Sequence, residues 1–206
     1  MNRIERNIGV LNTVTSKIKH HSHQLGSDYE EMLLLITKLE LIVRAEKSSH
    51  YEAFFSDISL ANELLSFYNR MDFNDKVAVN IISLIGNMIK RYGLPPTDEL
   101  FEFFYNLRMI KKVNYYVSLF ITQFPQFHSL SDKWDYLLSI PNIAPKLKSE
   151  RNFYIEMKKI IDSGEGIPYD YRDKVICIFN EFIKGAKNNF YPDDYKKIIY
   201  DIEMAV

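Results

Sequence analysis

Apolar residues recur at helical spacing along most of the chain. The clearest case is the segment 75–92, where Val77, Ile81, Leu84 and Met88 lie three or four residues apart. This spacing places them on one face of an α-helix. The sequence contains no Asn-Gly or Asp-Gly hairpin and no long strict alternation of apolar and polar residues, so strands are not expected. The pattern predicts an all-α fold.

Polar residues at the ends of the apolar segments indicate where the helices begin and end. Asn74 is a suitable N-cap for the segment 75–92, and Gly93 is a suitable C′ residue. Signals of this kind predict about ten helices joined by short turns. We expect them near residues 3–20, 27–47, 50–71, 75–92, 97–110, 112–124, 131–141, 145–162, 169–186 and from 192 onward, with a break in the third near Ser56-Asp57.

Short connections make neighbouring helices antiparallel, which leaves two architectures open. The pairs near 75–110 and 112–140 have the size of a repeat in a HEAT- or armadillo-like stack, which we favour. A compact helical bundle is the alternative. The most loop-like stretch, 163–168, leaves about 40 residues after it, which is marginal for an independent domain. We therefore expect one domain, residues 1–206.

Composition narrows the function classes. The 206 residues include 26 Lys and Arg against 27 Asp and Glu, so the net charge is −1 and nucleic acid is not the expected partner. The densest apolar run, 32–36, is far too short to span a membrane, and no membrane partner is expected. Cys177 is the single cysteine, stands in an apolar run and is expected to be buried. We expect a soluble, cytoplasmic protein.

No motif for enzyme chemistry stands out. His20, His21 and His23 lie together, but no carboxylate or cysteine at helical spacing accompanies them, so a polar helix end is the favoured interpretation. Ser163-Gly164-Glu165-Gly166 follows a helix and lacks the other residues of a phosphate-binding loop. We expect no metal site, no cofactor and no catalytic residues in this chain.

One short segment suggests an alternative. Arg44-Ala-Glu-Lys-Ser-Ser-His50 resembles the Arg-x(4–6)-His motif of HEPN-type ribonucleases, which are all-helical and use this pair at a helix end. The resemblance covers seven residues, and Ala45 stands where the family usually has a polar residue. It implies that Arg44 and His50 cleave RNA.

The aromatic residues point instead to binding. Four of them lie off the apolar faces of their helices and are therefore expected to be exposed, and exposed aromatic side chains on rigid helices are typical of protein-binding surfaces. They are Phe103, Tyr115, Tyr154 and Tyr169. AT-rich coding is an equally good explanation for the high aromatic content. The leading hypothesis is a non-enzymatic protein–protein interaction module, in its narrower form an immunity-type inhibitor that covers the active site of a cognate toxin or effector.

Overall fold

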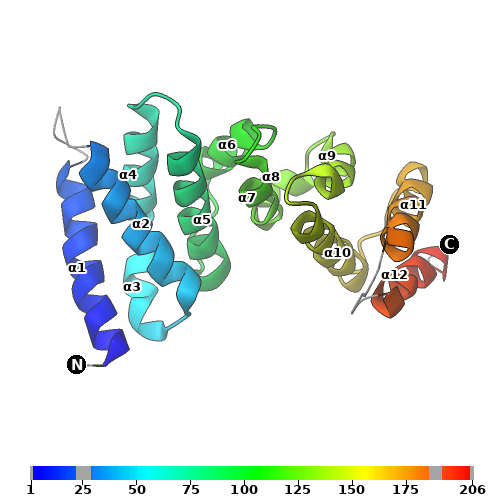
Figure 1. Ribbon diagram of the computed structural model, residues 1–206, viewed down its shortest axis with the longest axis horizontal. Coiled ribbons are helices and arrows are strands. Elements are labelled where there is room, and N and C mark those ends of the chain that lie inside the picture. The colour runs from blue at the N-terminus through cyan, green and yellow to red at the C-terminus, as the bar shows by residue number, and fades with distance from the viewer. Residues whose placement is uncertain (1, 22–28, 186–191, 205–206) are drawn as a thin grey trace. The chain divides into compact units, whose positions relative to one another are not determined.

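A computed structural model describes residues 2–21, 29–185 and 192–204. These residues form twelve α-helices and three short 3-10 helices, with no strand among them, which confirms the predicted all-α class (Figure 1). The elements are α1 (Arg3–His21), α2 (Tyr29–Ala45), η1 (Ser49–Tyr51), α3 (Glu52–Phe55), α4 (Ile58–Asn69), α5 (Asp75–Tyr92), α6 (Asp98–Leu107), α7 (Asn114–Ser118), η2 (Ile121–Gln123), α8 (Pro125–His128), α9 (Lys133–Ser139), η3 (Ile140–Asn142), α10 (Lys146–Asp162), α11 (Tyr169–Gly185) and α12 (Pro192–Met204).

The chain divides into two compact units, Met1–His128 (unit 1) and Ser129–Val206 (unit 2). The boundary lies between α8 and α9. The loop 163–168, which the sequence marks as the best candidate boundary, instead lies within unit 2, between α10 and α11. The expectation of a single domain stays a prediction.

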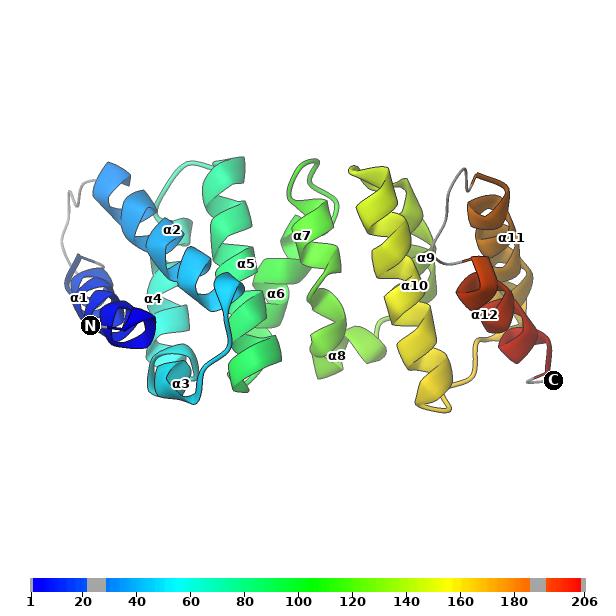
Figure 2. The ribbon, with the colours of Figure 1, turned by 60° about the horizontal axis from the view of Figure 1, so that its bottom comes forward.

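Unit 1 is built from helical hairpins stacked in two layers. α1 packs on α2 and on α4, and α5 also packs on α2 and on α4. The hairpin of α1 and α2 and the hairpin of α4 and α5 therefore form a four-helix arrangement. The hairpin of α6 and α7 follows, with α7 packed on α5. Figure 2 shows α2, α5 and α7 in one layer, with α4 and α6 behind them. η1 and α3 connect the two layers.

Gly86 lets the segment after α7 approach the backbone of α5 closely. The ring of Phe120, which follows α7, lies against the α5 backbone here, and a Cβ added at Gly86 would lie 2.2 Å from that ring. Phe120 is itself buried. A glycine at this buried helix position therefore allows α5 and the third hairpin to pack tightly in this layer.

Unit 2 follows the same packing scheme. η3, which directly follows α9, packs on α10, while α11 packs on α12, and the two pairs meet through α10–α12 and α9–α11 contacts (Figure 2). The ring of Trp134 stacks on Tyr171 with 5.8 Å between centroids, which joins α9 to α11. The buried Lys133 ammonium group pairs with Glu165 and ties the 163–168 loop to α9. Stacked hairpins occur in each unit, and the HEAT/armadillo assignment stays a prediction.

Several helix ends agree with the capping signals. Asn74 Oδ1 accepts hydrogen bonds from the Lys76 and Val77 amides, and Gly93 ends α5 in the left-handed region at φ 68°. Asp57 caps α4 at the predicted break in the third helix. The predicted helix 112–124 is wrong as a continuous element, because the structure breaks it into α7 and η2, and α8 was not predicted.

The start of α1 is held by a polar cluster around Glu46. The Glu46 carboxylate accepts hydrogen bonds from the Tyr51 hydroxyl at 2.6 Å and from the Asn7 amide at 3.0 Å, and Arg3 lies 3.7 Å away. The hydrogen bond from Tyr51 is the main reason that the pKa of Glu46 lies below its ordinary value. Burial raises the pKa of Tyr51. This cluster joins α1 to the segment that follows α2.

Within the described residues, no helix is both long enough and apolar enough to cross a membrane.

Candidate functional site

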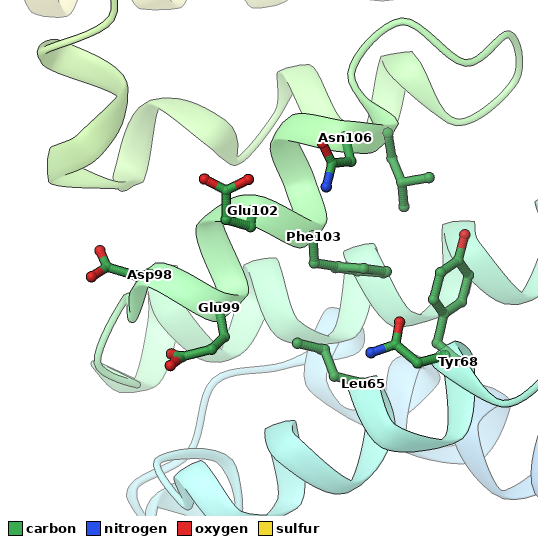
Figure 3. A pocket seen from close by; sticks show the side chains of 9 residues that line it. Leu65, Tyr68, Asp98, Glu99, Glu102, Phe103 and Asn106 are labelled. Atoms are coloured by element: carbon green, nitrogen blue, oxygen red, sulfur yellow. The ribbon is translucent and has the colours of Figure 1, made fainter.

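A groove of about 550 Å³ opens between α4 and α6 in unit 1 (Figure 3). Its floor is apolar and is formed by Leu65 and Tyr68 from α4 and by Phe103 and Leu107 from α6. The rings of Tyr68 and Phe103 meet edge to face, with 4.9 Å between centroids and 77° between planes. Burial in this floor raises the pKa of the Tyr68 hydroxyl. The groove falls within the size range of ligand-binding clefts.

Carboxylates form one end of the groove. Asp98, Glu99 and Glu102 from α6 line it, and the described residues that line the groove include no Lys or Arg. Figure 3 shows these three side chains gathered at one end and Asn106 with Tyr68 toward the other. The groove therefore combines an apolar floor with a strongly acidic end.

Two of these carboxylates are available to a ligand. Asp98 accepts a hydrogen bond from the Gln126 amide at 2.6 Å. Glu99 and Glu102 are exposed, and within the described part of the chain neither has an ion-pair or hydrogen-bond partner for its side chain. They lie three residues apart on α6 and so share one face of that helix. Two adjacent negative charges beside an apolar floor would favour a cationic, amphipathic ligand.

The local sequence explains why the acidic end lies here. The Thr97 hydroxyl caps α6 by accepting a hydrogen bond from the Leu100 amide. Asp98 and Glu99 therefore occupy the first turn, where carboxylates interact favourably with the helix dipole. Glu102 lies one turn further along the same face. The opposite faces of α6 are apolar and are buried against the rest of unit 1.

Exposed apolar residues occur just beyond the other end of the groove. Met109 follows α6 and is 69% exposed, and Phe73 follows α4 and is 54% exposed. The two loops that carry them are tied together, because Lys112 pairs with Asp75 at 2.6 Å. Two exposed apolar side chains therefore lie on the loops that follow α4 and α6.

The four aromatic residues expected at a partner surface lie in four different environments. Phe103 is buried against Tyr68, so its expected exposure is wrong, although its ring lines the groove. Tyr115 and Tyr154 are half-buried, and the Tyr154 ring packs on Tyr195 with 5.4 Å between centroids. Tyr169 is 84% exposed at the start of α11. They lie on four helices, two in each unit, and only Phe103 lines the groove.

Arg44 and His50 lie on consecutive elements at one end of unit 1. Arg44 is in the last turn of α2, where its guanidinium pairs with the buried carboxylate of Glu40 at 2.8 Å. Arg91 donates to the backbone carbonyl groups of Val43 and Arg44. His50 is exposed in η1. Because both guanidinium groups are engaged in holding the end of α2, no geometric observation favours the ribonuclease alternative, which stays a prediction.

The other candidates from the sequence are the histidines near the end of α1 and Cys177. The segment 22–28, with His23, lies outside the described residues, as does the side chain of His21. Among the described residues no group of three His, Cys, Asp or Glu side chains could hold a metal ion. Cys177 is exposed on α11, so its expected burial is wrong. Its apolar neighbours Val175 and Phe179 are buried, and Cys177 lies on the opposite face of the helix.

The Gly-x-Gly loop of unit 2 borders a second, smaller hollow. It measures about 110 Å³ and is lined by Gly164 and Arg172 among others. Arg172 donates to the carbonyl oxygen of Ile167 at 3.0 Å, so it holds the loop to α11. This hollow is below the size of ordinary ligand pockets.

Comparison with known proteins gives no relative: no family model, no curated protein and no solved structure matches this chain.

Proposed function

We propose that this protein is a protein–protein interaction module that holds a segment of its partner in the groove between α4 and α6. The observation that supports the proposal is the combination of an apolar floor with the carboxylates of Glu99 and Glu102, which have no partner in the part of the chain that the structure describes. The proposal includes a cytoplasmic location, since a chain with one cysteine can form no internal disulfide.

The walls of the groove favour a helical partner segment. Both walls are α-helices, whose backbone groups are satisfied within the helix, so a partner cannot be added as a β-strand. Recognition must come from side chains. An amphipathic helix that lays one face into an apolar groove is the peptide-recognition mode that meets this condition.

Photo-crosslinking tests the proposal at single positions. A photoreactive amino acid placed at Asn106, which lines the groove, should capture a partner protein in cells. The same group at Glu52, exposed on α3 away from the groove lining, serves as the control and should not. The double substitution E99K/E102K should abolish capture at Asn106 while the helical content of the protein is unchanged.

Equal capture at Asn106 and Glu52, or capture that survives E99K/E102K, would contradict the proposal. The narrower hypothesis of an immunity-type inhibitor makes one further demand. The captured partner should be a toxin or effector that loses its activity in complex with the wild-type protein. It should keep its activity when the E99K/E102K variant replaces the wild type.

A further inference from the structure

One helix face of unit 2 is cationic and partly apolar, which are the properties that the groove of unit 1 favours in a ligand. On α10, Leu147 is 79% exposed and Ile155 is 38% exposed. Lys148 and Arg151 are exposed between them in sequence. At 100° per residue these four side chains fall within one arc of the helix surface, which we call the α10 face.

The two cations of the α10 face are free to pair. Lys146, Lys158 and Lys159 on the same helix have acidic partners within α10. Lys148 and Arg151, in contrast, have no ion-pair or hydrogen-bond partner for their side chains among residues 2–21, 29–185 and 192–204. Two exposed apolar side chains thus lie together with two cations that have no partner in the described part of the chain.

The charges on the groove and on the α10 face match in number and in spacing. Glu99 and Glu102 lie three residues apart on α6, and Lys148 and Arg151 lie three residues apart on α10. Both pairs therefore repeat at about 4.5 Å along their helix axes. The apolar side chains of the α10 face can cover the apolar floor of the groove.

We infer that the groove of one copy of this protein binds the α10 face of a second copy. Because the two surfaces differ, the contact is heterologous, and each copy offers both a groove and a helix to its neighbours. The inference rests on the proposed function, since it uses the same groove. It also implies that self-association regulates partner binding. A second copy occupies the groove, so a partner must compete with it.

Charge exchange tests the inference with the full-length protein. The variant E99K/E102K has a cationic groove and a cationic α10 face, and the variant K148E/R151E has an acidic groove and an acidic α10 face. Each variant alone should associate at least about tenfold more weakly than the wild type, as measured by sedimentation velocity at rising concentration. An equimolar mixture should associate again, because opposite charges then meet in both directions.

A matched pair of variants separates the contact from general charge attraction. E52K/E181K and K47E/K184E carry the same net charges, and their four positions are exposed and lie outside both surfaces. Each should associate like the wild type. The inference is overturned if the wild type stays monomeric, if the mixture of groove and α10 variants does not associate, or if the matched variants behave like them.

The two proposals can fail separately. If crosslinking at Asn106 captures a different protein but the charge-exchanged variants do not associate, the proposed function stands and self-association is wrong. If Asn106 captures only a second copy and the mixture associates, self-association stands and the module has no foreign partner at this groove.

Discussion

Gly86 is the residue whose replacement should reveal most about the packing of unit 1. Alanine has a higher helix propensity by about 1 kcal/mol, but its Cβ would lie 2.2 Å from the buried Phe120 ring. Overpacking costs about 1–3 kcal/mol, and a rigid aromatic ring leaves little room to adjust. We expect Gly86→Ala to lower the free energy of unfolding by about 1–2 kcal/mol in denaturant titrations.

Gly9 provides the matched control. It lies exposed in α1, and no atom outside its own helix lies within 4 Å of the Cβ position. Gly9→Ala should therefore stabilise the protein by about 0.5–1 kcal/mol. An equal gain from Gly86→Ala would show that Phe120 does not lie against the α5 backbone.

Glu46 should make the stability of unit 1 depend on pH. Its pKa is lowered in the folded protein, chiefly by the hydrogen bond from Tyr51, so the unfolded chain binds the proton more tightly. The resulting stabilisation is present above pH 4.5, the ordinary pKa of the group, and is lost as the pH falls through the folded pKa. Glu46→Gln should reduce stability at pH 7 and flatten this dependence, as measured by thermal unfolding across pH.

Glu52→Gln is the control for that measurement, because Glu52 is exposed and has no side-chain partner among the described residues. It should leave both stability and its pH dependence as in the wild type. A pH profile that Glu46→Gln does not alter would contradict the assigned hydrogen bonds.

Single side chains were the hardest features to predict from the sequence. Phe103 lies off the main apolar face of α6, yet it is buried because Tyr68 of α4 covers it. Cys177 lies in an apolar run, yet it is exposed because α11 buries only one of its faces. In both cases the burial depends on a neighbouring element and not on the local pattern.

At the scale of elements, Asp57 joins two helices in two separable ways. Its carboxylate caps α4 by accepting from the Ser59 amide at 2.8 Å, and it pairs with Lys19 of α1 at 2.7 Å. Asparagine caps a helix as well as aspartate but cannot form the ion pair. We expect Asp57→Asn to cost less than about 1 kcal/mol and Asp57→Ala to cost about 1 kcal/mol more.

Lys19→Ala checks this division, since it should cost about as much as Asp57→Asn in the same unfolding measurement. If Asp57→Asn is as damaging as Asp57→Ala, then the ion pair and not the cap holds α4.

Helix boundaries were largely predictable because caps are local. Asn74, Asp57 and Gly93 act through amides and carbonyl groups within a few residues, so their types and positions are sufficient. The segment 112–124 was not predictable as a broken element. Its apolar side chains also suit one continuous helix, but the structure divides them between α7 and η2, with the buried Phe120 and Ile121 following α7.

At the scale of the whole molecule, Trp134 reports on how the two units unfold. It is the only tryptophan, lies in unit 2 and stacks on Tyr171. A single cooperative domain of residues 1–206 predicts that Gly86→Ala in unit 1 lowers the Trp134 fluorescence midpoint as much as the circular-dichroism midpoint. An unchanged fluorescence midpoint beside a lowered circular-dichroism midpoint would show that the units unfold separately.

The groove was not predictable from the sequence. It requires α4 and α6, which are separated along the chain by α5, to lie next to each other with only side chains bridging them. The sequence does place Asp98 and Glu99 in a first helical turn. Their interaction with the helix dipole is enough to explain them there, so the sequence alone does not indicate a ligand. These carboxylates line a groove only because α4 lies next to α6.

Hydrogen–deuterium exchange with a peptide of residues 145–162, which carries the α10 face, tests whether the groove between α4 and α6 is a binding site. When the peptide is added to the full-length protein, we expect slower exchange in α4 and α6 and unchanged exchange in α11 and α12. Slower exchange centred on the exposed Leu34 and Leu41 of α2, or no change at any concentration, would contradict it.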